Sequence, residues 1–533
     1  MTPPAGSNPE IPAHATGPGG SFLVAGLPGT ALDAETADFL SACRPAGVIL
    51  FRRNIHSAEA LFQLVSELKS LLGRDLIVGV DLEGGTVNRF ASLVPEMPAA
   101  MQIAATADPE MARSAGLLTG RLLSLFGFSL NFAPVLDCTF HFRENALGTR
   151  TFGSDAGLVT GMADSYIRGL GRTGINCTGK HFPGLGRADL DSHEVLPRIT
   201  AGRQDLEQHD LVPFRGLLPV LDMVMVGHGA YPALVEEAGK PASMASEIIG
   251  DILRHAMGYT GPVISDDLDM GAFSSLPDFR ASAASAFSAG CDLLLVCHDR
   301  NRMEEAAEGI GSILASGLSG KARGERARAR IMALKQNAAE RMPASLDHDL
   351  LREIRRAIRD LGEEVAKNSI TLVAGRWERV QGKCYCCYPV SSSDPLSGEG
   401  EQPALLTALR EEGMEAEWIA YPRDLPDTLP QRLAARLDEV HDGTILLITW
   451  NVHGKRNYAG FAGKLKSTGV PVVHLSLGLP GDCPPAAVDA SLAVYSASDP
   501  SVRAAASVLA GRLPPEGKLP VEPHLIQRTE GNG

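Results

Sequence analysis

Residues Leu76–Gly85 read LIVGVDLEGG, an uninterrupted apolar run that ends in a carboxylate and a pair of glycines. A strand that is apolar on both faces is typical of a parallel sheet covered by helices on both sides. Asp81 ends the apolar run, and Gly84 and Gly85 provide a tight turn behind it. The stretch therefore predicts a buried parallel strand that presents a carboxylate at its carboxyl end.

Seven further runs of this kind occur in the first 300 residues, separated by longer stretches of helical character. The eight candidate strands are Ser21–Gly26, Gly47–Phe51, Leu76–Asp81, Ser129–Pro134, Ile175–Lys180, Asp222–Val226, Pro262–Asp266 and Cys291–Val296. Eight alternating units favour a closed (β/α)8 TIM-type barrel over an open sheet. Such barrels carry their chemistry at the carboxyl ends of the strands, so polar residues at those ends are candidate site residues.

A second alternation of strand-like and helix-like segments begins after Asn368 and predicts a smaller α/β/α sandwich. The expected organisation is a disordered tail at 1–20, a catalytic barrel at 21–345, a linker helix at 346–367 and the sandwich domain at 368–533. The segment from Gly317 to Asp360 is basic with apolar residues at helical spacing. We expect it to be a solvated helix face that crosses between the domains.

Composition limits the possible partners and the location. The formal net charge of −14 argues against nucleic acid as a partner, because phosphate contacts need a basic surface. No apolar run approaches the roughly 20 residues of a membrane span. The chain also has no Lys or Arg before Arg44, whereas a secretory signal begins with basic residues. We therefore expect a cytoplasmic protein with no membrane partner, and composition leaves its oligomeric state open.

Cysteine usage favours reduced thiols in the core, because most of the nine cysteines lie in apolar, strand-like runs. Cys384 and Cys387 form a lone CxxC within KCYCCYPV. A zinc site usually needs a second ligand pair, so this segment is better explained as a buried strand. We expect neither a metal nor a cofactor.

The segment most suggestive of chemistry is KHFPGLGRADLDSHEVLP, from Lys180 to Pro197. Lys180 and His181 supply hydrogen-bond donors where the barrel opens. Asp191 and His193 are two residues apart, so both project to one side of an extended chain. An Asp that accepts a proton from one imidazole nitrogen fixes the tautomer and raises the basicity of the other nitrogen. This pair therefore predicts a proton shuttle.

A candidate nucleophile lies in GPVISDDLDM, from Gly261 to Met270. Asp266 follows an apolar strand directly, so its carboxylate should face the barrel mouth, where it could attack an anomeric carbon. Asp267 and Asp269 compete for this role, but capping and solvent contact explain them equally well. Asp266 is preferred because it follows the strand immediately.

Two further segments supply candidate substrate contacts. Asp81 could accept hydrogen bonds from two sugar hydroxyls, with Glu83 and Arg89 as supports rather than contacts. Arg150, in ENALGTRTFG, could reach a substrate hydroxyl or carboxylate, and an ordinary surface arginine is the equal alternative.

Together these segments resemble glycoside hydrolase family 3, and within it the bacterial β-N-acetylglucosaminidases that act on peptidoglycan fragments. The matching pieces are VDLEGG, LNFAPVLD, GTRTFG, KHFPG-x-G, DSHEVLP, MVGHGAYP and ISDDLDM, in family order over most of the first 300 residues. DSH after KHFPG is the most specific piece, because it is similar to the loop that marks the hexosaminidase branch. The last stretch, ending in LPPEGKLPV, resembles the family's C-terminal sandwich more weakly.

The resemblance implies a two-step retaining mechanism without a metal. It implies Asp266 as the nucleophile, His193 as the acid/base and Asp191 as its partner. It also implies a small N-acetylglucosamine-containing carbohydrate as the substrate. The sugar contacts that it implies are Asp81, Arg150, Lys180 and His181.

The chain departs from the family pattern at three positions. The family usually has His at Leu185, Gln at Leu82 and Arg at Thr86. Leu185 removes a polar group beside the site, and Thr86 removes an expected charge partner of a neighbouring carboxylate. These departures bear on substrate fit and rate, since the named catalytic residues are intact.

Three other functions remain as alternatives within the sequence reasoning. His181, His193, His228 and Asp266 at a barrel mouth could bind zinc, although the usual His-x-His of the first strand is missing. Lys180 could form a Schiff base in an aldolase, which leaves Asp191 and His193 without a role. Another family 3 β-glycosidase, or a catalytically impaired sugar-binding relative, is the remaining possibility.

Overall fold

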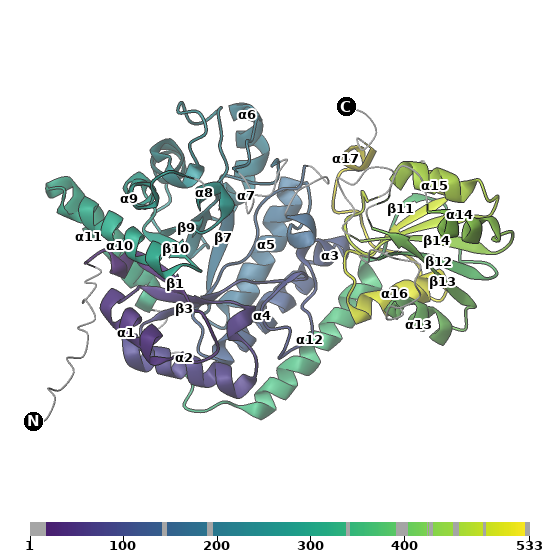
Figure 1. The fold of residues 1–533 in the computed structure, drawn as a ribbon, viewed down its shortest axis with the longest axis horizontal. Helices are drawn as coiled ribbons and strands as arrows, with labels where there is room; N and C mark the ends of the chain where they lie inside the picture. Colours follow the sequence, from purple (N-terminus) through teal and green to yellow (C-terminus); the bar gives the residue numbers. More distant parts are fainter. Residues whose placement is uncertain are drawn as a thin grey trace, which may run out of the picture.

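The computed structural model describes residues 17–140, 147–188, 196–274, 276–336, 342–390, 403–423, 425, 430–450, 458–482 and 487–527. Figure 1 shows two bodies side by side, a larger one built from the first part of the chain and a smaller one built from the last part. The long helix α12 (His348–Ser369) runs from beneath the first body to the second.

The larger body is a closed barrel of eight parallel strands in the order β1-β10-β9-β8-β7-β6-β3-β2, which confirms the predicted fold. The strands are β1 (Leu23–Gly26), β2 (Gly47–Leu50), β3 (Ile77–Val80), β6 (Leu130–Asn131), β7 (Asn176–Phe182), β8 (Met223–Val226), β9 (Val263–Asp267) and β10 (Leu293–Val296). Each lies within or beside one of the eight predicted runs. A hairpin of β4 (Leu82–Gly84) and β5 (Val87–Asn88) follows β3 directly.

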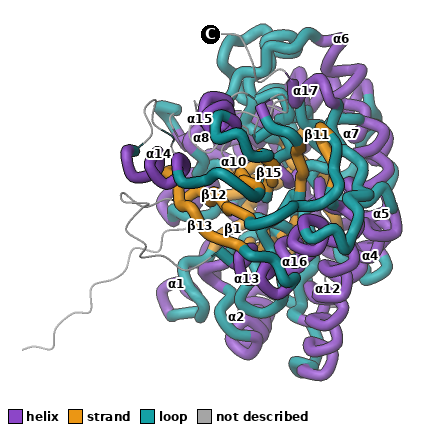
Figure 2. The backbone as a smooth tube through the Cα atoms, turned by 90° about the vertical axis from the view of Figure 1, so that its right-hand side faces the viewer, coloured by secondary structure: helices purple, strands orange, loops and turns teal. Residues whose placement is uncertain are grey.

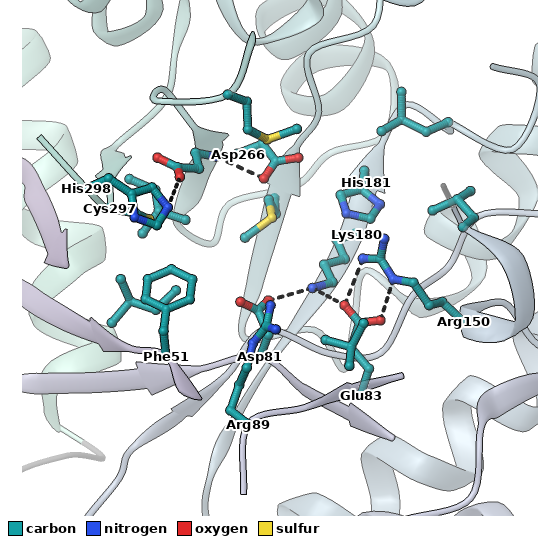
Figure 3. Close-up of a pocket in the computed structure, with 18 of the residues that line it drawn as sticks. Phe51, Asp81, Glu83, Arg89, Arg150, Lys180, His181, Asp266, Cys297 and His298 are labelled. Atoms are coloured by element: carbon teal, nitrogen blue, oxygen red, sulfur yellow. Dashed lines mark hydrogen bonds and ion pairs between the residues drawn. The ribbon is translucent and has the colours of Figure 1, made fainter. Parts of the chain in front are cut away.

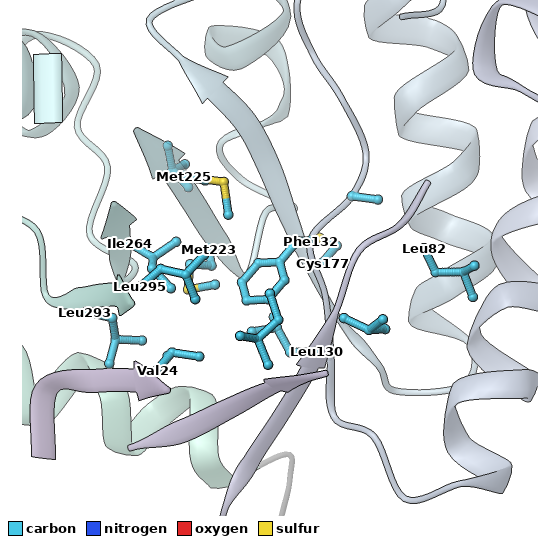
Figure 4. Packing of buried hydrophobic residues seen from close by; sticks show 14 of the residues in the cluster. Val24, Leu82, Leu130, Phe132, Cys177, Met223, Met225, Ile264, Leu293 and Leu295 are labelled. Atoms are coloured by element: carbon cyan, nitrogen blue, oxygen red, sulfur yellow. The ribbon is translucent and has the colours of Figure 1, made fainter. Parts of the chain in front are cut away.

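The interior of the barrel is filled by side chains rather than open. Figure 4 shows Phe132, Leu130, Met223 and Ile264 gathered between the strands, and all four are fully buried. A Cβ atom at Gly79 would lie 2.9 Å from Phe132 Cε2, so the glycine in β3 leaves room for this ring. Burying each such side chain contributes about 1.5–3 kcal/mol, which makes the barrel core a major source of stability.

Aspartates begin many of the helices around the barrel, each accepting a backbone N–H of the first turn. The six capping residues are Asp33, Asp108, Asp155, Asp278, Asp299 and Asp347. The helices of the barrel region are α1 (Ala34–Cys43), α2 (Ala58–Leu72), α3 (Ala100–Ala105), α4 (Pro109–Leu125), α5 (Ala156–Gly171), α6 (Arg203–Asp205), α7 (Leu211–Leu217), α8 (Gly271–Ser274), α9 (Phe279–Ala289), α10 (Arg300–Ala315) and α11 (Leu318–Gln336). The described part of this region also contains the 3-10 helices η1 (Gly20–Phe22), η2 (Arg52–Asn54), η3 (Gly148–Arg150) and η5 (Ala242–Met244). It further contains the π-helical segments η4 (Leu206–Asp210) and η6 (Glu247–Ala256).

The basic segment after Gly317 forms two helices, α11 and α12, rather than one solvated face. Asp292, which is 0% exposed and precedes β10, pairs with Arg323 at 2.9 Å, Arg254 at 2.8 Å and Arg330 at 3.1 Å. The expectation of a solvated face is therefore wrong for Arg323, which is buried. The residues around Arg323 in the sequence do not indicate its burial, because Asp292 lies just before β10, 31 positions earlier in the chain.

The smaller body is a three-layer α/β/α sandwich, as predicted. Its sheet has the order β11-β16-β15-β14-β12-β13, with only β11 antiparallel to its neighbour. The strands are β11 (Thr371–Gly375), β12 (Cys384–Val390), β13 (Ala416–Pro422), β14 (Thr444–Thr449), β15 (Val472–Ser476) and β16 (Ala490–Ala493). One apolar cluster joins the sheet to α13 (Ala404–Glu411) and α16 (Asp499–Leu509), and a second joins it to α14 (Gln431–Asp438) and α15 (Tyr458–Lys466).

The cysteine-rich segment is indeed a buried strand, β12. Cys384, Cys386 and Cys387 are buried in it, and the eight cysteines within the described ranges are all free thiols. Among the helices that the structure describes, none combines the length and apolar character needed to cross a bilayer.

The two bodies share an apolar interface. Met101 and Ala105 of α3 pack in one buried cluster with Tyr495 and Val521 from the second body. Gln102 Nε2 donates to Ser501 Oγ at 2.7 Å across the same boundary. Figure 2, turned by 90° from Figure 1, shows α16 beside α12, and the two helices are in contact. A short helix, α17 (Pro523–Gln527), ends the described chain.

Candidate active site

A cavity of about 370 Å³ opens at the carboxyl ends of the barrel strands. Its wall includes four of the predicted site residues and Asp266, the predicted nucleophile; Figure 3 shows them facing one another across the cavity. They come from β9, from β7, from the end of β3 and from η3. The residues of the sequence prediction found here are Asp81, Arg150, Lys180, His181 and Asp266.

A chain of charges forms one wall of the cavity. Lys180 Nζ lies 2.8 Å from Asp81 Oδ1 and 2.5 Å from Glu83 Oε1. Arg150 binds Glu83 through two nitrogens, at 2.8 and 2.9 Å. Burial alone would raise the pKa of Glu83, but the charges of Arg150 and Lys180 hold that pKa well below its usual range. Glu83 is therefore an ionised anchor that fixes two cationic groups at the cavity wall.

Asp266 is held ionised on the opposite wall. Burial by itself raises the pKa of Asp266, but His181, His228 and the Asp267 amide outweigh it, so that its pKa lies below the ordinary value. The Asp267 N–H donates to Asp266 Oδ1 at 2.9 Å. Asp266 is half-buried in the cavity wall, and an ionised carboxylate there is available as a nucleophile at neutral pH.

His228 holds the backbone next to the candidate nucleophile. Its Nε2 donates to the carbonyl of Asp267 at 3.1 Å, and its Nδ1 lies 2.8 Å from Ser243 Oγ. Burial lowers the pKa of His228. When the ring is neutral, Nε2 donates to the carbonyl and Nδ1 accepts from the Ser243 hydroxyl. The zinc alternative assigned this residue as a ligand, whereas both of its nitrogens are used within the barrel.

His181 is oriented by Asp137, a residue to which the sequence reasoning gave no role. Asp137 is 0% exposed, and its Oδ2 lies 2.7 Å from His181 Nδ1. The same carboxylate accepts the backbone N–H of His181 at 3.1 Å and that of Leu185 at 2.6 Å. Because a carboxylate only accepts, Nδ1 carries a proton, and Nε2 is the nitrogen left for the cavity.

Asp267 and Asp269, the competitors of Asp266, occupy different surroundings. Asp269 accepts the backbone N–H groups of Cys297, His298 and Asp299, so it ties β9 to the loop after β10. Asp267 does line the cavity, 3.5 Å from His298. Burial, with repulsion from neighbouring carboxylates, raises the pKa of Asp267 to about 7. At neutral pH Asp267 is therefore a weaker candidate nucleophile than Asp266.

Arg89 is a cavity residue that the sequence reasoning treated as a support. Its side chain lines the cavity, and within the described part of the chain its buried Nε has no hydrogen-bond partner. Arg89 directly follows β5, which pairs with β4 across the Gly84–Gly85 turn, and this hairpin carries it to the cavity. A sequence signal was present, because Arg89 lies eight positions beyond Asp81 in the same hairpin segment.

The three departures have separate consequences. Leu185 lines the cavity and is buried, so it makes that part of the wall apolar. Leu82 is buried in β4, away from the cavity, and its backbone bonds Asn131. Thr86 is exposed, and the neighbouring carboxylate Glu83 has Arg150 and Lys180 as charge partners.

The segment that carries Asp191 and His193 lies outside the described residues. Ala188, just before it, lines the cavity, and Arg187 pairs with Asp210 at 2.8 Å. Within the ranges that the structure covers, no group of three or more His, Cys, Asp or Glu side chains is arranged to hold a metal ion. Asp81 and Glu83 raise the pKa of Lys180 despite its burial, which makes this amine a poor Schiff-base nucleophile.

Comparison with known proteins agrees with this geometry. The family model described as "Glycosyl hydrolase family 3 N terminal domain" matches residues 23–334. A β-hexosaminidase of Idiomarina loihiensis is 35% identical over 285 residues, covering 52% of this chain and 84% of that protein. A β-hexosaminidase of Pseudomonas aeruginosa is also 35% identical over 285 residues, covering 53% of this chain and 84% of its own length.

Two solved structures extend the comparison. A glycoside hydrolase family 3 β-N-acetylglucosaminidase from Paenibacillus sp. str. FPU-7 has a TM-score of 0.83 and 27% identity, covering 96% of this chain and 98% of its own. NagZ from Neisseria gonorrhoeae has a TM-score of 0.54 and 30% identity, covering 64% of this chain and 97% of its own. The chain belongs to glycosyl hydrolase family 3, and it is a glycoside hydrolase whose barrel is followed by an α/β sandwich domain.

Proposed function

We propose that this enzyme is a retaining β-N-acetylglucosaminidase that releases terminal N-acetylglucosamine from peptidoglycan fragments or related glycosides. The observation that carries the reaction type is the ionised, half-buried Asp266, which faces the charged wall of Asp81, Lys180, Glu83 and Arg150. The choice of sugar is supported by the relatives named β-hexosaminidase and β-N-acetylglucosaminidase. A related structure also carries N-trifluoroacetyl-D-glucosamine.

The charged wall suits the hydroxyl groups of a single sugar ring. Asp81 accepts hydrogen bonds from hydroxyls, whereas Arg150, Lys180 and His181 donate to them. Arg89 also lines the cavity and is a further candidate donor. Their mutual ion pairs hold these groups in place before substrate arrives, which reduces the entropy lost on binding.

The reaction that we propose has two displacement steps. Asp266 attacks the anomeric carbon, the bond to the leaving oxygen breaks, and His193 gives that oxygen a proton. Asp191 holds the imidazole in the required tautomer. In the second step His193 removes a proton from water, whose oxygen attacks the anomeric carbon and releases the Asp266 carboxylate. Two inversions retain the configuration of the sugar.

A panel of aryl glycosides (N-acetyl-β-glucosaminide, β-glucoside and β-xyloside) tests this proposal. We expect the N-acetylglucosaminide to be cleaved best, with the β-anomer released first in a proton NMR time course. Asp266→Ala should lower kcat by at least about 1,000-fold, because the covalent step is lost. Unchanged turnover by this variant contradicts the mechanism.

A second variant separates the acid/base from the nucleophile. His193→Ala should lose less rate on a nitrophenyl glycoside than on a disaccharide, because a good leaving group needs little protonation. Equal losses on both would contradict the role of His193. Full activity in the presence of EDTA would argue against the zinc alternative, and binding of N-acetylglucosamine without any turnover would indicate the sugar-binding relative.

A further inference from the structure

We infer that the second domain takes part in substrate binding without touching the substrate, because a C-terminal strap holds the loop that carries Arg150. The strap is residues 516–522, which cross from the sandwich back to the barrel. This inference rests on the proposed role of Arg150 in binding the sugar. The strap contacts three parts of the molecule in turn.

The strap is fixed to the second domain at one end. Glu516 forms an antiparallel bridge with Thr371, the first residue of β11. The Gly517 N–H donates to the carbonyl of Ile370 at 2.9 Å. Here a side chain on Gly517 would collide with the backbone of Ser369, since a Cβ would lie 2.1 Å from its carbonyl oxygen.

The strap then crosses the interface between the domains. The Lys518 N–H donates to the carbonyl of Ala105, the last residue of α3, at 2.7 Å. Val521 is 3% exposed and packs in the interface cluster with Met101 and Ala105. The middle of the strap is therefore held by both a hydrogen bond and apolar burial.

The far end of the strap contacts the loop after η3. The Ser154 N–H donates to the Pro520 carbonyl at 3.1 Å, and the Glu522 N–H donates to Ser154 Oγ at 2.8 Å. A Cβ at Gly153 would lie 2.1 Å from the same Pro520 oxygen, and Gly153 has a φ of +151°. The contact is thus a close approach of two backbones that only glycine permits.

This loop directly follows η3, whose last residue is Arg150 of the cavity wall. Gly153 and Ser154 come three and four residues after Arg150, whose guanidinium is paired with Glu83. On the barrel side, the Thr139 N–H donates to the Gly153 carbonyl at 2.8 Å. The loop therefore lies between the barrel on one side and the strap on the other, and a displacement of the strap should displace Arg150.

The test compares two matched serine variants. Ser154→Ala removes the side-chain bond to the strap. Ser501→Ala removes the interdomain bond to Gln102, away from the loop. We expect Ser154→Ala to raise KM about fivefold with kcat within about twofold, the pattern of a lost binding contact. The Ki of N-acetylglucosamine should rise by the same factor. Ser501→Ala should leave both constants within about twofold of wild type.

Two further variants link the strap to Arg150. Gly153→Ala should raise KM more than Ser154→Ala, because it separates the two backbones. In an Arg150→Lys background, Ser154→Ala should change KM by less than about twofold, since its effect acts through Arg150. Equal effects of Ser154→Ala and Ser501→Ala, or an undiminished effect in the Arg150→Lys background, would overturn the inference.

The strap test is separable from the proposed function. The variants are assayed on whichever aryl glycoside of the panel the wild type cleaves, so a wrong sugar assignment leaves the comparison intact. A wild type that cleaves none of the panel overturns the proposed function, and the Ki series is then replaced by calorimetric titration with N-acetylglucosamine, in which Ser154→Ala should weaken binding about fivefold.

Discussion

At the scale of single residues, the site depends on buried groups whose charge is set by a partner. Glu83 and Asp137 never need to touch a sugar, yet each fixes the orientation of a group that faces the cavity. Both carboxylates lie within hydrogen-bond distance of their partners and are closed off from water. Removing the charge of Glu83 or Asp137 should therefore change the orientation of the cavity residue that it binds, Arg150 or His181.

Asp137→Asn tests this at His181. The new side-chain amide can donate to Nδ1 of His181, which the wild-type carboxylate cannot do. This would favour the tautomer that carries its proton at Nε2, the nitrogen left for the cavity. We expect kcat/KM to fall by about 10- to 100-fold with a shifted pH profile, as for other supports of a functional histidine. Asp164→Asn, at a half-exposed position of α5, is the matched control. A profile that keeps its shape would contradict the role of Asp137.

Asp267 provides a test of stability against pH. Its pKa is raised from 3.8 to about 7, so between these values the folded enzyme binds a proton that the unfolded chain has lost. Stability from this group is complete below about pH 4 and is lost as the pH rises through 7. Asp267→Asn should therefore gain on the order of 4 kcal/mol over wild type at pH 8 and little at pH 4. Urea unfolding of wild type and Asp267→Asn at pH 4 and pH 8 measures this difference in stability. An equal gain at the two pH values would refute the prediction.

At the scale of elements, one carboxylate ties helices to the closed end of the barrel. Asp292 precedes β10 and binds three arginines, two of them from α11 and one from η6. It also accepts the backbone N–H of Val263, which begins β9. This cluster lies at the amino ends of the strands, opposite the cavity, where barrels carry stability rather than chemistry.

Asp292→Asn should accordingly lower the free energy of unfolding by about 3–5 kcal/mol, because it leaves the buried Arg323 without a counter-charge. Steady-state activity at 25 °C should stay near that of wild type, since the cluster is remote from Asp266. Arg326→Gln, on the exposed side of α11, is the matched control and should unfold like wild type. Guanidinium unfolding curves measure the loss of stability. Coincident curves for Asp292→Asn and wild type would contradict the stabilising role of Asp292.

At the scale of the whole molecule, the barrel and the sandwich are joined by an apolar interface and by the strap, so they act as one enzyme in our proposal. Periodicity alone predicted both bodies, because strand burial on two faces leaves an unbroken apolar run wherever it occurs. It also predicted that Asp81, Lys180, His181 and Asp266 would meet, since the ends of parallel strands share one face of a barrel. Asp191 and His193 stay predictions, resting on a local motif.

What the sequence determined by itself is the set of local properties: which runs are strands, which residues follow them, and which residue types stand ready for glycoside chemistry. Only the tertiary structure decided the pairings, because partners such as Glu83 and Arg150, Asp137 and His181, or Ser154 and Glu522 are distant in the chain. Ion pairing and pKa depend on separations of a few ångströms and on exclusion of water. Those quantities arise when the barrel closes and the strap returns to it, and no local pattern encodes them.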